Sequence, residues 1–227
     1  MSTKTLQALK KFVLFSDLTP AQMERVAAIS QDRRFRMGAT IFIEGDKSTY
    51  VVLITSGIVK ISRSAADGRV KTLALLKTTD FFGEMAIFLP GHKRSATAEA
   101  LTECKVITIE QDEFERLLKE VPAISIKIIQ TLAQRLQAAD RQIKMLALGD
   151  SRMKLADLLL SLGEEFPEHG KGSVLIPLTH QDLADLAGLS RETTTRLLNS
   201  FSSEDILTLK ARQVLLKKPD LLKKYAN

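Results

Sequence analysis

Two arginines and a glutamate share one face of a predicted helix near the C-terminal end of the sequence. Arg191, Glu192, Thr195, Arg196 and Asn199 follow one another at helical spacing, which places their side chains together on the surface. Arginine pairs bidentately with guanine, and a carboxylate accepts a hydrogen bond from cytosine N4. This face therefore suits the reading of base edges in DNA; the alternative is an ordinary charged surface in water.

The residues around this face predict a helix-turn-helix. Thr179 and Ser190 stand where helix N-caps belong, and Gly188 supplies a turn in which positive φ has no steric cost. Segments 206–209 and 213–216 then predict a small hairpin, or wing. The residues expected to bury the inner side of the helix pair are Leu183, Ala184, Ala187, Leu189, Leu197, Leu198 and Phe201. Such a motif presents the start of its second helix to the major groove.

A second set of residues, earlier in the chain, is suited to hold a sugar and a phosphate. This set consists of Gly83, Glu84, Met85, Ala86, Arg94 and Ser95. Gly83 allows a close backbone approach, and residues 84–88 predict one helical turn whose N–H groups can face an anion. Glu84 can accept from a sugar hydroxyl, and Arg94 can hold a phosphate with its planar fork. The alternative is a surface loop with an arginine cap.

Short β-rich runs surround this second set and must position it. They lie at 33–36, 40–43, 50–56, 58–64, 71–76, 97–100 and 104–109. Glycine-containing turns separate them, and Asp67-Gly68 is a strong hairpin signal. Closely spaced short strands predict an antiparallel sandwich or roll. Helical spacing precedes the strands over about 6–28, and a short helix is expected at 111–119.

A long helix is predicted from Pro122 to about Leu148. Its apolar residues recur at alternating steps of three and four, the pattern of a two-stranded coiled coil. They are Ile129, Leu132, Leu136, Ala139, Ile143 and Leu146. This narrow stripe predicts a homodimer, whereas the alternative is a helix packed on its own sheet. Gly149 should break the helix, and Asp150 or Ser151 should cap the next one, at about 152–162.

Composition and charge limit the possible functions. The net charge of +6 over 227 residues permits nucleic-acid binding, and part of it comes from a lysine-rich segment at 206–227. Cys104 is the only cysteine, so no intramolecular disulfide and no four-cysteine metal or iron–sulfur site is possible. The absence of a signal pattern and of a long apolar run predicts a cytoplasmic chain that does not enter membranes.

Two motifs together carry a family resemblance. Gly83-Glu84 with Arg94-Ser95 resembles the phosphate-binding cassette of cyclic-nucleotide-binding domains. With the long helix and Ser190-Arg191-Glu192-Thr193-x-x-Arg196, residues from about 12 to 222 resemble the CRP/FNR family of bacterial transcription regulators. The resemblance implies an α+β fold: an N-terminal antiparallel, jelly-roll-like β-roll (1–121), a long dimerisation helix with its hinge (122–149) and a C-terminal winged helix-turn-helix (150–227).

The resemblance also implies a nucleotide effector, although one part of the family pattern is missing. In cyclic-AMP-responsive members, the cassette glycine and glutamate meet the ribose, and its arginine and serine hold the cyclic phosphate. Those members carry threonine and serine on the long helix for adenine, where this chain has Ala139 and Asp140. An ionised Asp140 can only accept hydrogen bonds, which suits guanine N1–H and N2–H₂ better than adenine. The hypothesis is therefore a guanine nucleotide, or another effector than cyclic AMP.

The sequence also allows other effectors and other functional classes. Heme sensing is an alternative, with His92, His169 and His180 as ligands by residue type, and so is regulation without a ligand. A β-roll enzyme is the less favoured rival, because the strands carry no histidine–carboxylate cluster of metal spacing. A nucleotide-binding module of a kinase or channel is a further rival, against which the winged helix-turn-helix argues.

In the family, the motif of the second helix reads double-stranded DNA with half-sites resembling TGTGA. By resemblance, Arg191 and Arg196 take guanines and Glu192 a cytosine, while Ser190 and Thr193 are placed for phosphates. Thr195 stands where relatives have glycine or serine, and Asp205 and Ala211 stand in the wing where glycines are common. RNA polymerase is the implied protein partner, with 67–69 and 164–168 as candidate contact loops.

Overall fold

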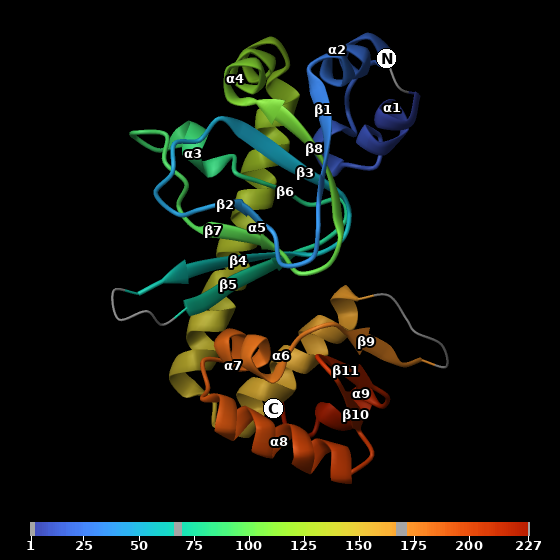
Figure 1. Cartoon of the computed structure of the whole chain (residues 1–227), viewed down its shortest axis with the longest axis vertical. Helices are drawn as coiled ribbons and strands as arrows, with labels where there is room; N and C mark the ends of the chain where they lie inside the picture. Colours follow the sequence, from blue (N-terminus) through green and yellow to red (C-terminus); the bar gives the residue numbers. More distant parts are fainter. Residues whose placement is uncertain (1–2, 66–69, 167–171, 227) are drawn as a thin grey trace. The chain divides into compact units, whose positions relative to one another are not determined.

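The computed structural model describes residues 3–65, 70–166 and 172–226, and the chain forms two compact units, Met1–Arg135 and Leu136–Asn227 (Figure 1). In the first unit, two antiparallel four-stranded sheets have the strand orders β1-β8-β3-β6 and β2-β7-β4-β5. The strands are β1 (Ser30–Phe35), β2 (Thr40–Phe42), β3 (Tyr50–Ser56), β4 (Val59–Ser64), β5 (Val70–Leu76), β6 (Phe81–Phe82), β7 (Thr97–Ala100) and β8 (Cys104–Glu110). The predicted antiparallel roll is confirmed. The Asp67-Gly68 turn lies outside the described residues.

Strand β3 shows why the first sheet is buried on both faces. Successive side chains of a strand point to opposite sides. Val52 and Ile54 face a core formed with residues of the second sheet, whereas Val51 and Leu53 face a core shared with helices. The run 51–54 is therefore continuously apolar rather than alternating.

Helices cover the outer face of that first sheet. They are α1 (Thr3–Leu9), a 3₁₀ turn η1 (Val13–Phe15), α2 (Pro20–Ala28), α4 (Gln111–Glu120) and the first part of α5 (Pro122–Leu148), while α3 (Met85–Phe88) follows β6. The expected helical stretch at 6–28 is thus divided into three elements. Thr19 begins α2 with a reciprocal capping box with Gln22 and a proline in the first turn.

The predicted apolar stripe of α5 is partly buried in its own unit and partly exposed to solvent. Leu132 packs against the helix-covered core of its own unit, so the own-sheet alternative holds there. Ile129, Leu136 and Ile143 are 65%, 65% and 63% exposed, and Ala139 is also exposed. Leu146 belongs to α5, but its side chain lies outside the described part. Within the described chain, three large apolar residues one heptad apart are thus left facing solvent.

The second unit begins beyond Arg135 and contains the winged helix-turn-helix. Its elements are α6 (Ser151–Glu165), β9 (Val174–Ile176), α7 (His180–Ala187), α8 (Arg191–Ser203), β10 (Leu207–Lys210), β11 (Gln213–Leu216) and α9 (Pro219–Leu222). Asp150 caps α6 by accepting from the backbone N–H groups of Arg152 and Met153, both at 2.8 Å. The wing is a three-stranded sheet, because β9 pairs with β11 beside the predicted hairpin.

Candidate DNA-reading face and nucleotide cassette

Local hydrogen bonds fix the start of helix α8, and the apolar side chains on its inner face pack against the rest of the unit. Ser190 Oγ accepts from the backbone N–H of Thr193 at 3.1 Å, and Thr179 caps α7 reciprocally with Asp182. Gly188, with φ 66°, makes the turn between the two helices. The predicted inner residues are buried, except Leu189, which is half-buried; Leu186 is buried as well.

The outer face of α8 collects the predicted base-reading side chains. Arg191, Glu192, Thr195, Arg196 and Asn199 line one shallow hollow, whose volume is about 440 Å³. Four of them are exposed and Thr195 is half-buried. The pKa of Glu192 is lowered by a hydrogen bond from its own backbone N–H and by the Ser190 side chain, so its carboxylate is an acceptor at neutral pH.

One neighbour of this face was missed by sequence reasoning. His180, the first residue of α7, places its Nδ1 3.0 Å from the hydroxyl of Thr195 on α8. Burial lowers the pKa of His180, and the charge of Arg191 lowers it further. No local pattern connects residues fifteen positions apart, because their contact depends on the packing of two helices.

Two residues around the wing have positive φ, the backbone conformation that glycine adopts most readily. Asp205, with φ 54°, occupies the left-handed region, and its carboxylate accepts from Lys217 and Lys218 at 2.8 and 2.7 Å. In the β10–β11 turn the residue of positive φ is Arg212, at 58°, one position after Ala211. Aspartate tolerates this conformation because its short side chain can hydrogen-bond locally.

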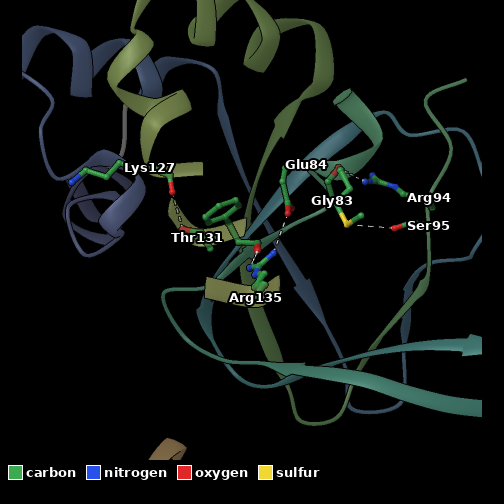
Figure 2. Close-up of polar contacts among 9 residues, drawn as sticks. Gly83, Glu84, Arg94, Ser95, Lys127, Thr131 and Arg135 are labelled. Carbon is green, nitrogen blue, oxygen red and sulfur yellow. Dashed lines mark hydrogen bonds and ion pairs between the residues drawn. The ribbon is translucent and has the colours of Figure 1, made fainter. Parts of the chain in front are cut away.

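In the first unit, the residues of the predicted cassette come together around Gly83. Gly83 has φ 86°, and a Cβ on it would lie 2.5 Å from Arg94 Nη1. Arg94 is only 3% exposed, and its fork donates to the carbonyls of Gly83, at 3.1 Å, and Tyr50, at 2.6 Å. The guanidinium also lies over the ring of Phe42, 4.0 Å from its centroid. Figure 2 shows Arg94 directed back toward Gly83.

Glu84 is bonded to a residue that sequence reasoning missed. Its Oε1 lies 3.0 Å from Nη1 of Arg135 on α5, and Arg135 also donates to the carbonyl of Phe81 (Figure 2). Glu84 is 1% exposed, and its Oε2 has no hydrogen-bond partner among the described residues. Burial raises the pKa of Glu84, opposed by the charges of Arg135 and Arg94.

The remaining cassette residues lie on or beside α3. This helix starts at Met85 directly after Glu84, with Ala86 buried beneath it. Ser95 is exposed, and its hydroxyl contacts the sulfur of Met85 at 3.9 Å. Asp140 lies further along α5, in the second unit, and is exposed, as is Ala139. Six of the seven predicted ligand-binding residues thus belong to the first unit and lie around Gly83, with Arg135, Tyr50 and Phe42 as additional partners, whereas Asp140 belongs to the second unit.

The histidines weighed as heme ligands have other partners where they are described. His92 Nδ1 lies 3.1 Å from the carbonyl of Ala86 and 3.0 Å from the amide of Gln111, and His180 contacts Thr195. His169 lies outside the described residues. Within the described chain, no group of three or more histidine, cysteine or acidic side chains is arranged to hold a metal ion. The described helices also include none that is long and apolar enough to cross a membrane.

Comparison with known proteins gives matches in both units. Residues 32–121 match the model of the cyclic nucleotide-binding domain, and residues 153–225 match that of the Crp-like helix-turn-helix domain.

Several relatives match nearly the whole chain. A CRP-like cAMP-activated global transcriptional regulator of Mycobacterium tuberculosis is 30% identical over 222 residues, covering 97% of this chain and 99% of the relative. The cyclic AMP receptor protein of Thermus thermophilus is 31% identical over 218 residues, covering 96% and 98%. Among solved structures, the c-di-GMP responsive regulator CLP of Xanthomonas campestris has a TM-score of 0.76 at 26% identity, covering 87% of this chain and 99% of that one.

Proposed function

The chain belongs to the CRP/FNR family of DNA-binding transcription regulators, and from this premise we propose that it is a homodimer that reads an inverted repeat of TGTGA-like half-sites under the control of a nucleotide effector. It is a regulator and not an enzyme. The observation that carries the proposal is the shared hollow of Arg191, Glu192, Thr195, Arg196 and Asn199 on the outer face of α8.

The chemistry of this face supports the assignment of bases. Arg191 and Arg196 are exposed and carry rigid forks of donors that match guanine O6 and N7. Glu192 stays ionised and can accept from cytosine N4. Ser190 and Thr193, at the N-terminus of α8, are placed to hold phosphates, which fix the position of the protein without specifying sequence.

The exposed stripe on α5 supports the homodimer. Ile129, Leu136 and Ile143 repeat every seven residues and are more than half exposed, and the smaller Ala139 lies between them. A parallel second copy would cover this stripe, and Leu146 and the partly buried Leu132 would complete the predicted seam. Large apolar side chains in register on an exposed helix are typical of such seams.

The cassette supports a nucleotide effector. Glu84, one of whose oxygens has no hydrogen-bond partner in the described part of the chain, would meet the ribose, and Arg94 with Ser95 would hold the phosphate. Binding would redirect the Arg94 fork, two of whose donors are now used by backbone carbonyls. Two relatives are named for cyclic AMP and one for c-di-GMP. We favour a guanine nucleotide, because Asp140 can accept from guanine N1–H and N2–H₂.

The partners of Glu84 and Arg94 also support the second candidate, regulation without a ligand. Arg135 and the carbonyls of Gly83 and Tyr50 already satisfy most of this buried charge. In the effector-controlled form, α5 would carry the response, since this continuous helix holds Arg135 near its middle and leads to α6 at its C-terminal end. A nucleotide acts only through its differential affinity for the two DNA-binding states.

We further propose RNA polymerase as the protein partner and the cytoplasm as the location, as for other regulators that act on chromosomal DNA. Of the candidate polymerase contacts, residues 67–69 lie outside the described chain. In the segment 164–168, Glu164 is exposed on α6, and residues 167–168 are not described.

One experiment tests the function and the effector together. Titration calorimetry with cyclic AMP, cyclic GMP and c-di-GMP is followed by binding to an inverted-repeat duplex and to a scrambled duplex. We expect a guanine nucleotide to bind and to raise the preference for the inverted repeat, and Asp140→Ala to lower its affinity. Specific DNA binding without any nucleotide effect would establish the second candidate. Equal binding to both duplexes under all conditions would contradict the proposed function.

A further inference from the structure

The contact between His180 and Thr195 lies inside the proposed reading face. Thr195 shares the hollow with the two arginines, and its hydroxyl is 3.0 Å from His180 Nδ1. We propose that His180 is a positioning residue that sets whether the Thr195 hydroxyl donates or accepts, and thereby which bases Thr195 recognises. The inference rests on the proposed function, because it assumes that α8 enters the major groove.

The hydrogen-bonding capacities of the two groups are complementary. A threonine hydroxyl has one donor and two acceptor positions, and a neutral imidazole has one nitrogen of each kind. When Nδ1 lacks a proton, it accepts the hydroxyl hydrogen, and Thr195 presents only lone pairs to DNA. When Nδ1 carries a proton, it donates to the oxygen, and the Thr195 hydrogen is free for an acceptor on a base.

The surroundings of His180 favour the unprotonated Nδ1 at neutral pH. Helices α6 and α8 pack against α7. From α8, the charge of Arg191 acts on the imidazole, and on α7 itself the Asp182 carboxylate is bonded to Thr179. Among the described residues, the side-chain hydrogen bond of His180 is made through Nδ1, so a proton on Nε2 remains available to water or to a DNA phosphate. Such a contact would hold the proton on Nε2 and leave Nδ1 as the acceptor.

This polarity predicts a base preference. An accepting Thr195 favours the amino groups of adenine N6 and cytosine N4, whereas a donating Thr195 can pair with guanine O6 or N7, thymine O4 and also adenine N7. The pKa of His180 lies below its ordinary value in the free protein, and a nearby phosphate would raise it. Acidification therefore removes the advantage of adenine and cytosine over guanine and thymine at the base pair beside Thr195.

The test selects duplexes from a library randomised across one half-site, using the full chain under whichever nucleotide condition gives sequence-selective binding. We expect an adenine or cytosine preference of about threefold to tenfold beside Thr195 at about pH 8, lost or reversed at about pH 5. His180→Asn, which carries a non-titrating amide, should show the same preference at both pH values. Thr195→Val should remove the preference at both, and Thr195→Ser should keep it.

The guanine preferences assigned to Arg191 and Arg196 provide the internal control. Glu192, whose pKa is lowered, should remain ionised at about pH 5, so these preferences should survive acidification. If they survive and the base beside Thr195 shows no pH-dependent preference, or His180→Asn retains that dependence, the inference is wrong and the proposed function stands. If no position shows a preference at either pH, the proposed function fails and the inference with it.

Discussion

We expect Arg196 and Lys210 to contribute to DNA binding in two different ways. Arg196 lies in the reading hollow, whereas Lys210 is an exposed residue of β10 in the wing. We expect Arg196→Ala to cost about 1–3 kcal/mol at one base pair and to relax the sequence preference there. Lys210→Ala should weaken all sequences alike and reduce the slope of log affinity against log salt by about one. Competition binding with single-base variants separates the two effects, and an unchanged ratio of target to scrambled DNA in Arg196→Ala would refute the assignment.

Gly83 is the residue on which the geometry of the cassette depends most closely. Gly83→Ala combines positive φ with a Cβ 2.5 Å from Arg94 Nη1, so Arg94 must shift. Gly91 is a matched control, because it has a similar φ of 80° and open space around the added Cβ. Each alanine should cost about 1–2 kcal/mol of stability from backbone strain, and Gly83→Ala should in addition lose nucleotide affinity. Chemical denaturation and calorimetry measure the two effects; equal nucleotide affinities in both variants would contradict this role.

At the scale of elements, a charged cluster lies at the junction between α8 and the wing. Hydrogen bonds from Lys217 and Lys218 lower the pKa of Asp205 to about 2. A carboxyl whose folded-state pKa is depressed contributes stability above its unfolded pKa, and that contribution is lost as pH falls from about 4 to about 2. The effect should be small, since both lysines and Asp205 are exposed.

Asp205→Asn tests this contribution, because asparagine tolerates the same positive φ without the charge. We expect its melting temperature to lie below that of the wild type above about pH 5, and the gap to close toward about pH 2. A gap of the same size across the whole range would show that charge at Asp205 is not the cause.

Elements with a strong local signal could be predicted from the sequence. The capped helices α2, α7 and α8 and the long α5 begin where caps and prolines indicate. The two-residue strand β6 was missed, because its pairing with β3 depends on the register Val52↔Phe82 and not on length or alternation. The extension of α6 to Glu165 likewise exceeds the expected end at 162.

Only those parts of the site that lie in short sequence motifs could be predicted. Gly83, Glu84, Arg94 and Ser95 were found because they lie in two short segments of recognisable chemistry. Arg135 was missed, since an arginine on a helix gives no sign that it will lie 3.0 Å from a glutamate 51 residues earlier. The buried position of the Arg94 fork was missed for the same reason: tertiary packing decides which donors of an arginine remain free.

At the scale of the whole molecule, the proposed recognition of an inverted repeat depends on the homodimer. Leu136→Glu places a charge in the middle of the exposed stripe and should dissociate the dimer, because each buried leucine contributes roughly 1.5–3 kcal/mol. Gln137→Glu adds the same charge at the next, exposed position and should leave the dimer intact. Sedimentation across a concentration series measures the change; identical behaviour of both variants and the wild type would exclude this stripe as the interface.

The spacing of half-sites tests the central claim most directly, because two copies joined along α5 should hold their α8 helices a fixed distance apart. Affinity and stoichiometry are measured on inverted repeats whose half-site centres lie about one helical turn apart, and on the same repeats lengthened by about half a turn. We predict two chains per duplex, with tight binding to the first series and markedly weaker binding to the second. Equal affinity for both, or equally tight binding of one chain to a single half-site, would contradict the account.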